Sequence, residues 1–412
     1  MQCQTLIFVT IRQVKIGPDF ERIMVHEKCF VPTKFTLLTV LLASTLMLLG
    51  GAAVAPALPA IAAAFPDAGD MTVDLIVTLP SLAVAISGLL IGALADRIGK
   101  VKVLLASLLI FAVAGVSGFF LEDMTLLLVG RFFVGVGIAG ITSCCSALIT
   151  EYYHGDIRLK VLGYQTAAMG LGVLILEVGG GTLAEFGWHE PFLIYSIGFL
   201  ILLMAIVSMR EPKNDVVIAD APDRVTDKRA IAICYLGIAV AMIVMYALPT
   251  KLATYVVQTT DASTTLIGLA LGLNGVFNAG VCLMYRRIAR AVPRRYLLTV
   301  GLGLMAIGMI LLSVSGDITW IIISSCVVGM GVGMCTTTVM NVLSDNVTPA
   351  SSGKVMGGYT TFFNLGQFIS TFVIAAMISL TGNLKGLYLS MGIIAAIAAV
   401  IFLPLMLSIK RE

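Results

Sequence analysis

The chain carries Gly92-Ala93-Leu94-Ala95-Asp96-Arg97-Ile98-Gly99-Lys100-Val101-Lys102 between two long apolar runs, residues 73–95 and 102–121. Gly92 allows a neighbouring helix to approach closely, and Gly99 permits a tight turn. Asp96 stands at the end of the first run, where it can pair with a basic side chain or face the positive end of a helix. On residue chemistry alone, an ordinary charged loop explains this stretch equally well.

Apolar runs of this kind recur along the chain. A helix that spans the bilayer needs about 20 mostly apolar residues, and its backbone groups must be satisfied inside the span. Twelve runs meet this requirement, at residues 35–57, 73–95, 102–121, 124–148, 161–184, 191–209, 230–250, 264–285, 296–315, 318–342, 354–380 and 384–408. The sequence therefore predicts an all-α membrane protein with twelve transmembrane helices.

The composition excludes a water-soluble globular protein. Of 412 residues, 59% are hydrophobic and 12% charged, with a mean hydropathy of +1.03, whereas soluble domains carry about 25% charged residues. The net charge of +3 gives no reason to expect a nucleic-acid partner. The eight cysteines form no CxxC pair, and the three histidines lie near predicted span ends or in the N-terminal stretch. We therefore expect no metal, no cofactor and no catalytic residues.

Basic residues predict the orientation of the spans. If the N-terminus is cytoplasmic, the inner loops and the C-terminal end hold eighteen Lys and Arg, while the outer loops hold only Lys251 and Lys385. Cytoplasmic loops of membrane proteins carry the excess of positive charge. Both termini are therefore predicted to be cytoplasmic.

A constant offset of 194 residues relates the two parts of the chain. It places Gly135-Val136-Gly137 on Gly329-Met330-Gly331, Glu151 on Asp345, residues 160–163 on 354–357, and Gly172 on Gly366. Parallel repeats of this kind are a known transporter architecture. We therefore expect six-helix halves at 35–209 and 230–412, joined by a polar cytoplasmic linker at 210–229. Residues 1–34 are expected to form a cytoplasmic tail, with Met24 as an alternative start of translation.

The stretch that begins at Gly92 closely resembles the loop motif G-x-L-x-D-R-x-G-R-K of the major facilitator superfamily, with Val101 in place of a basic residue. Residues 55–61, Ala-Pro-Ala-Leu-Pro-Ala-Ile, resemble the family's first helix at its outer end. Residues 131–137, Arg-Phe-Phe-Val-Gly-Val-Gly, are similar to its R-x-x-x-G-x-G element. Together these resemblances cover about residues 35 to 408, and they imply the major facilitator fold of two pseudo-symmetric six-helix halves.

The resemblance also implies a cytoplasmic gating role for the loop residues Gly92, Asp96, Arg97, Gly99 and Lys100. In the family this loop latches the two halves together when the protein is open outward. Asp96 would then contact the start of the eleventh helix, near residues 353–357.

Two charged residues lie deep in predicted spans. Arg131 stands seven residues into the run 124–148, which is about 10 Å into the apolar slab. Glu177 lies at a similar depth in the neighbouring run 161–184. Deep charges are costly, are functional by default, and are usually paired. We expect a direct or water-bridged pair with Glu177 as the proton-coupling acid, the alternatives being a snorkelling Arg131 and a static structural pair.

The run around Glu177 resembles G-x-x-x-G-P-x-x-G-G, a signature of the family's antiporters. Gly172, Gly180 and Gly181 match it, while Leu176 replaces the middle glycine and Glu177 replaces the proline. The resemblance implies a drug:proton antiporter of the multidrug or sugar efflux type.

Polar side chains within the spans are candidates to line a substrate cavity, because amides in membrane helices usually face the bundle interior. These candidates are Gln165, Tyr246, Asn274, Asn278, Asn341, Asn364 and Gln367. Hydrogen bonding between helices is the alternative reading of each.

We therefore predict a secondary active transporter, not an enzyme, in the inner or plasma membrane. It is expected to act as a monomer and to export small amphipathic or drug-like compounds in exchange for protons. The alternatives are a proton symporter that imports a small nutrient or organic anion, and a non-transporting membrane receptor or scaffold.

Overall fold

Long apolar helices make up most of the computed structural model, which describes residues 32–48, 50–212, 227–346 and 349–408. Within this part of the chain, eleven helices or helix pairs are long and apolar enough to cross a membrane. They are α4 (Asp70–Ile98), α5 (Lys100–Ser117), α6 (Met124–Tyr152), α7 (Gly155–Ala184), η6 with α8 (Glu190–Ser196 and Ile197–Ser208), α9 with α10 (Lys228–Met245 and Ala247–Thr259), α11 (Thr264–Ala291), α12 (Arg294–Val314), α13 (Ile318–Asp345), α14 (Pro349–Thr381) and α15 (Leu384–Leu407).

A twelfth span is bent rather than continuous. It consists of α2 (Lys34–Thr45), η3 (Leu46–Leu48), η4 (Ala52–Ala57) and α3 (Leu58–Ala64), with a bend of 44° between its two parts. Proline cannot donate a backbone hydrogen bond, and this segment contains Pro56 and Pro59. Counting the bent pair as one span gives the predicted twelve.

The helices begin at positions that repeat through the chain. α2, α4, α5, α6, α7 and η6 begin at residues 34, 70, 100, 124, 155 and 190, and α9, α11, α12, α13, α14 and α15 each begin 194 residues later. Local chemistry repeats too, because Asp123 caps α6 and Asp317 caps α13. Likewise, Lys100 pairs with Glu151 and Arg294 pairs with Asp345. The offset found in the sequence is therefore a structural repeat that supports the division into two six-helix halves.

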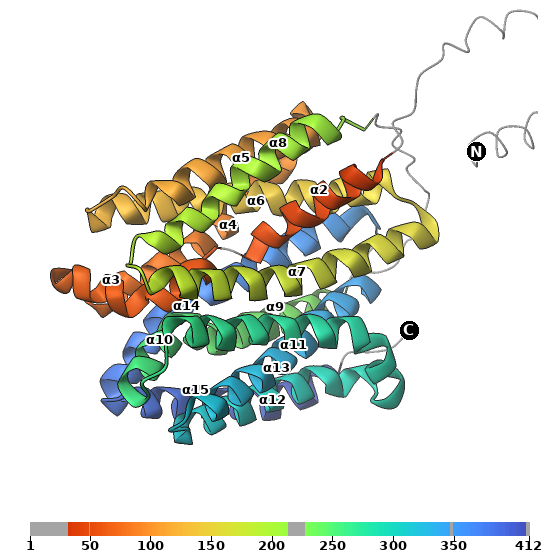
Figure 1. The fold of residues 1–412 in the computed structure, drawn as a ribbon. Helices are drawn as coiled ribbons and strands as arrows, with labels where there is room; N and C mark the ends of the chain where they lie inside the picture. The colour runs from red at the N-terminus through yellow and green to blue at the C-terminus, as the bar shows by residue number, and fades with distance from the viewer. Residues whose placement is uncertain (1–31, 49, 213–226, 347–348, 409–412) are drawn as a thin grey trace, which may run out of the picture. The chain divides into compact units, whose positions relative to one another are not determined.

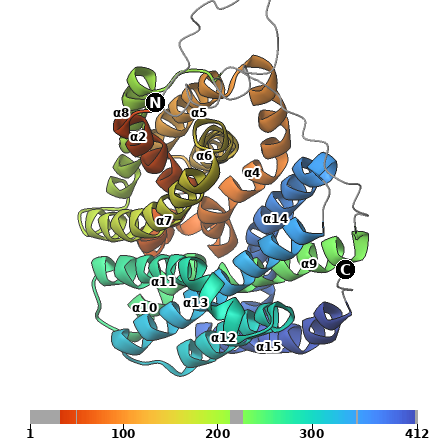
Figure 2. The same cartoon turned by 90° about the vertical axis from the view of Figure 1, so that its right-hand side faces the viewer.

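The two sets of six helices meet along two seams. α7 packs against α11 in one seam, and α4 packs against α14 in the other (Figure 1, Figure 2). Glycines let the α7–α11 backbones approach, since a Cβ at Gly268 would clash with the carbonyl of Glu177 and one at Gly181 with Thr264. We call the end of the bundle where α8 ends and α9 begins the linker end, and the end where α3 and α10 lie the opposite end.

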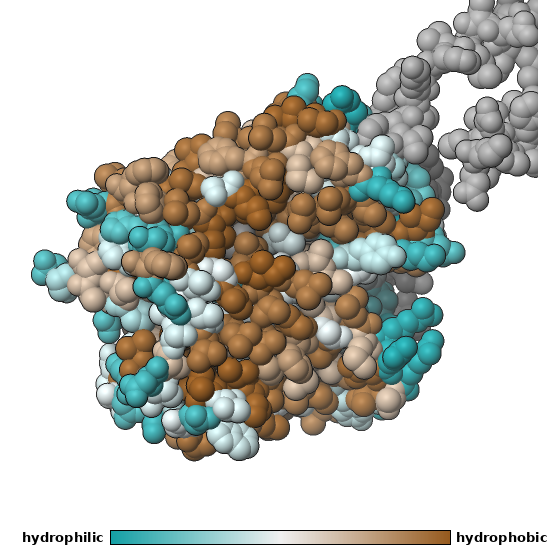
Figure 3. Space-filling view, viewed as in Figure 1, coloured by the Kyte–Doolittle hydropathy of each residue, from teal (hydrophilic) through white to brown (hydrophobic). Residues whose placement is uncertain are grey.

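The face of the bundle seen in Figure 3 is apolar between two polar ends. Exposed aliphatic and aromatic side chains around the bundle include Leu90, Phe120, Ile175, Val207 and Val400. Such a continuous apolar surface fits lipid rather than water.

The observed spans match the predicted ones in number and order, and the largest differences in their bounds are at the first and seventh spans. The predicted first span, 35–57, ends too early, because α3 continues to Ala64. The predicted seventh span, 230–250, ends too early, because α10 continues to Thr259. Lys251, predicted to lie in an outer loop, lies inside α10 and is 6% exposed. The predicted tail at 1–34 and the predicted linker at 210–229 lie largely outside the described residues.

Candidate functional site

Arg131 is buried in the first half of the bundle, at 1% exposure. Its Nε donates to the carbonyl of Ile76 at 2.9 Å, and its Nη2 donates to Tyr195 Oη at 2.9 Å and to the carbonyl of Gly50. The guanidinium also lies over the ring of Tyr195, 5.0 Å from its centroid, in a favourable cation–π position.

Breaks in two helices make the carbonyl acceptors of Arg131 available. Pro80 lies four residues after Ile76 in α4, and because proline lacks an N–H, the Ile76 carbonyl has no donor within its own helix. Gly50 lies where the first span is broken. A carbonyl freed in a membrane span must find another donor. Arg131 supplies that donor at both places.

Glu177 faces the same region without forming the expected ion pair. It is 4% exposed, and its Oε2 has no hydrogen-bond partner in the described part of the chain. The expected direct pair with Arg131 is not seen, and the bonded donors of Arg131, Nε and Nη2, go instead to backbone carbonyls and a tyrosine hydroxyl. Arg131 Nη1 also has no partner within the described residues. Tyr195 and Tyr246 are each within electrostatic range of both charges.

The described residues do contain a buried ion pair, at a place that the sequence analysis did not predict. Asp74 on α4 and Lys251 on α10 are joined by an Oδ1–Nζ distance of 2.9 Å, and they are 2% and 6% exposed. Glu177 is therefore not the only buried carboxylate in the spans. A signal was present, because Asp74 already lies inside the predicted run 73–95 and Lys251 adjoins the run 230–250.

The polar candidates are divided between the seams and the separate halves. Gln367 accepts a hydrogen bond from Ser81 at 2.6 Å across the α4–α14 seam. Gln165 donates to Ser44 at 2.9 Å, and Asn274 donates to the carbonyl of Ser325 at 2.9 Å, so each joins helices within one half.

The remaining candidates to line a cavity are only partly buried or form hydrogen bonds within their own helix. Asn341 donates to the carbonyl of Thr337 and Asn364 donates to the carbonyl of Thr360, each at 2.8 Å and within its own helix. Asn278 and Tyr246 are half-buried. The structure therefore brings Tyr246 into the region of Arg131 and Glu177, but it does not gather the asparagines there.

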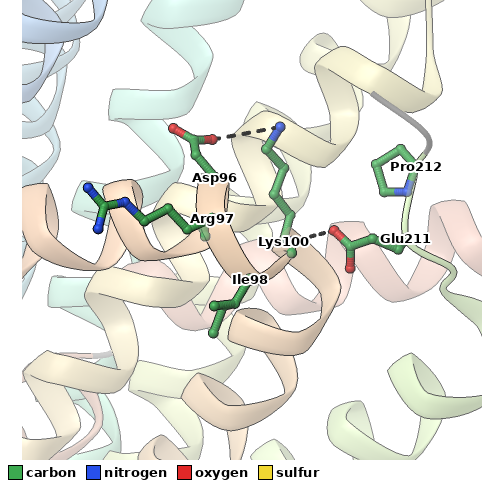
Figure 4. A pocket seen from close by; sticks show the side chains of 8 residues that line it. Asp96, Arg97, Ile98, Lys100, Glu211 and Pro212 are labelled. Atoms are coloured by element: carbon green, nitrogen blue, oxygen red, sulfur yellow. Dashed lines mark hydrogen bonds and ion pairs between the residues drawn. The ribbon is translucent and has the colours of Figure 1, made fainter. Parts of the chain in front are cut away.

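The charged loop after α4 forms a network at the linker end (Figure 4). Lys100 pairs with Glu151 of α6, and its Nζ lies 3.9 Å from Asp96. Gly99 has a φ of 110°, which glycine tolerates without a steric penalty. Asp96 and Arg97 are exposed, and Gly92 is half-buried near Ser143. The expected contact of Asp96 near residues 353–357 is not seen in the described part of the structure: no hydrogen bond or ion pair joins Asp96 to residues 354–357, and residue 353 has no described side-chain environment.

Sequence reasoning missed a further member of this network, Glu211. Its carboxylate accepts hydrogen bonds from the backbone N–H groups of Lys100 and Val101, the first residues of α5. A negative charge at a helix N-terminus is stabilising. Glu211 therefore ties the segment after α8 to the loop motif. Its position within the predicted polar linker gave no sign of a cap.

Thr265 of α11 and Glu185, which follows α7, join the two halves at the opposite end. The Thr265 hydroxyl donates to Glu185 Oε1 at 2.6 Å, and this hydrogen bond holds the pKa of the Glu185 carboxyl below its ordinary value. In the described residues, no group of three His, Cys, Asp or Glu side chains could hold a metal ion.

Comparisons with known proteins agree with this architecture. Residues 40–371 and 234–411 match the family model of the Major Facilitator Superfamily. The chain is 24% identical over 359 residues to the class H tetracycline resistance protein of Pasteurella multocida, covering 84% of this chain and 89% of that protein. It is 31% identical over 137 residues to the niacin transporter NiaP of Acinetobacter baylyi, covering 33% of this chain and 31% of that one.

A solved structure shows the same fold. A bacterial homolog of the human lysosomal transporter Spinster, in an inward-facing and occupied conformation, superposes with a TM-score of 0.71. It shares 19% sequence identity and covers 90% of this chain and 94% of its own. This fold is that of transporters rather than of enzymes.

Proposed function

Because the chain belongs to the major facilitator superfamily, we propose that it exports small amphipathic compounds in exchange for protons, with Glu177 as the proton carrier. The site lies in a membrane-spanning bundle whose two halves can move against each other about a buried region. Export is supported by the similarity to a tetracycline resistance protein over most of both chains.

The observation that carries this proposal is the environment of Glu177. Its carboxylate is buried with an unpartnered Oε2, and its backbone touches Gly268 of the other half. A buried carboxylate without a counter-ion is costly in its charged form, so the protonated form suits the packed state. When the halves move apart at the α7–α11 seam, water can reach the group and accept the proton. Proton release is thereby linked to the conformational change.

Arg131 acts on this carboxylate from a distance. Its charge is fixed in place by the Ile76, Gly50 and Tyr195 acceptors, and its unpartnered Nη1 leaves one donor for an incoming group. A fixed positive charge favours the deprotonated state of a nearby acid, so Arg131 assists the release of the proton when water reaches Glu177. Substrate that reaches Tyr246, which is in electrostatic range of both charges, would alter this balance.

A second candidate function is import of a small organic anion together with a proton. It is favoured by the similarity of about a third of the chain to a niacin transporter and by the free Nη1 of Arg131, since a guanidinium binds carboxylates well. A receptor or scaffold that does not transport is disfavoured, because it would have no use for two unpaired buried charges.

Reconstitution into proteoliposomes tests both transport functions. Purified protein would be assayed with a cationic dye and with an aromatic carboxylate, under a pH gradient of either sign. Glu177→Gln mimics the protonated acid, so it should abolish gradient-driven accumulation while substrate exchange without a gradient continues. Glu122→Gln, at an exposed loop carboxylate, is the matched control and should transport normally. A Glu177→Gln protein that still builds a gradient would show that the proton travels elsewhere.

We also propose an orientation in which both termini and residues 210–229 lie in the cytoplasm. The protein is proposed to act as a monomer in the inner membrane. The excess of basic residues at the linker end supports this orientation. Single cysteines placed in the segment 213–226 should react with an impermeant maleimide only after the cells are opened. Labelling in intact cells would show that this segment lies outside and would contradict the proposed orientation.

A further inference from the structure

The pair formed by Asp74 and Lys251 joins the two halves of the bundle. Asp74 lies one turn into α4 of the first half, and Lys251 lies one turn into α10 of the second. Their charged atoms are 2.9 Å apart, and both side chains are almost fully buried. The described chain has no other salt bridge between the halves, because its other ion pairs join residues within one half.

The pair lies among other polar contacts between the halves, and all of these lie toward the opposite end. In the α4–α14 seam, Thr78 is hydrogen-bonded to Thr371 at 2.6 Å. In the α7–α11 seam, Thr264 donates to the Gly181 carbonyl at 2.7 Å, and Thr265 donates to Glu185. Within the described residues, no hydrogen bond between the halves lies nearer the linker end than the Ser81–Gln367 bond. This structure is therefore closed at the opposite end by a set of polar contacts.

Charge distinguishes the Asp74–Lys251 pair from the other contacts. A hydroxyl pair that separates can rebind to water with little change in energy. A buried ion pair is different, because loss of either partner leaves an uncompensated charge in an apolar surrounding. The pair is therefore favourable when the opposite end is closed, and each charge alone is favourable only when that end opens to water.

We propose that Asp74 and Lys251 form an electrostatic latch that holds the opposite end closed and must separate each time that end opens. The neighbourhood supports a closure role. α10 packs against α3, α4 and η4 of the first half, so Lys251 stands on the element that covers this end. Asp70 is exposed one turn before Asp74, where it can attract Lys251 as the halves approach.

The latch is independent of the proton chemistry proposed for Glu177, and its test measures conformation rather than transport. Spin labels at Asp67 and Asp261, exposed residues of the two halves near the opposite end, would report the distance across that end in lipid nanodiscs. A second label pair at Arg158 and Arg287, exposed near the linker end, would report the other side. The native cysteines would be replaced first.

Asp74→Asn and Lys251→Gln should each raise the ratio of open to closed protein at the opposite end by about tenfold or more, because each leaves one unpaired buried charge. The exchanged pair Asp74→Lys with Lys251→Asp should return the distance distribution toward that of the parent protein. Asp345→Asn breaks the exposed Arg294–Asp345 pair within one half, and it should change neither distance.

Two outcomes would overturn the latch. One is a folded Asp74→Asn or Lys251→Gln protein whose distances at both ends equal those of the parent. The other applies if the single variants fail to fold: an exchanged pair that folds but stays open at the opposite end would show that attraction between these two charges does not hold it closed.

Discussion

Replacement of Arg131 by methionine should destabilise the protein strongly and almost independently of Glu177. The change removes three hydrogen bonds, to Ile76, Gly50 and Tyr195. Hydrogen bonds from a charged donor contribute about 1.5–3 kcal/mol each, so the gross loss is roughly 4–9 kcal/mol. Removal of a buried charge returns several kcal/mol of desolvation. The expected net loss is therefore about 2–4 kcal/mol, chiefly because two freed carbonyls remain without donors.

A double-mutant cycle tests the separation of Arg131 from Glu177. Groups that share no contact give additive effects within about 0.5 kcal/mol, whereas groups in contact couple by about 0.5–3 kcal/mol. Arg131→Met and Glu177→Gln should therefore be additive, because no contact joins the two side chains and Glu177 is proposed to be protonated in the packed state, which Gln mimics. Arg131→Met and Tyr195→Phe should not be, because these side chains are hydrogen-bonded at 2.9 Å.

The free energy of unfolding would be measured by circular dichroism in mixed micelles as the denaturing detergent is increased. Arg295→Met is a matched control, because Arg295 is exposed at the start of α12, and it should stay within about 0.5 kcal/mol of the parent. A coupling above about 1 kcal/mol between Arg131 and Glu177 would show that the two side chains interact, as a direct or water-bridged pair.

Three further predictions concern the polar ends of the bundle. Glu211→Ala removes the carboxylate that caps α5, and it should lower the free energy of unfolding by about 1 kcal/mol; an unchanged denaturation midpoint would contradict the capping role. Gly99→Ala should lower the free energy of unfolding by more than about 1 kcal/mol, because its φ of 110° and ψ of 139° lie in a region that only glycine commonly adopts and the new Cβ would lie 2.8 Å from Glu211; Gly88→Ala, with open space around it, should be neutral or stabilising in the same assay. The hydrogen bond from Thr265 lowers the pKa of Glu185, so this bond is fully present above the ordinary carboxyl pKa and is lost as the pH falls through the lowered pKa. Thr265→Val should therefore raise the Glu185 pKa in an NMR titration. An unchanged Glu185 pKa would exclude the hydrogen bond.

Much of the fold could be predicted because a bilayer imposes a local rule on the sequence. Each span must be apolar for its whole length, so its existence can be read from about 20 residues without knowledge of any other span. The same locality explains why the offset of 194 residues found in the sequence reappears in the starts of six helices and in the caps Asp123 and Asp317. Caps and turns depend on neighbouring residues, so a repeated sequence repeats them.

The site could be predicted only as a set of unusual residues, not as a set of partners. Arg131 and Glu177 stood out because charge is rare in a span, and both are buried as expected. The predicted direct ion pair between them is not present, and Arg131 instead donates to the carbonyl freed by Pro80 on α4. The sequence reveals that Pro80 leaves Ile76 without a donor, but it does not reveal which distant side chain supplies one.

The number, order and repeat of the spans, together with the loop motif at Gly92–Lys102, could be predicted from local sequence. The pairing of Asp74 with Lys251 and the capping of α5 by Glu211 became visible only once the helices were placed in space. The physical reason is that burial in a span is a property of one helix and its solvent, whereas an ion pair or a cap between distant segments depends on how the helices pack. At such places, two costly groups become favourable only together.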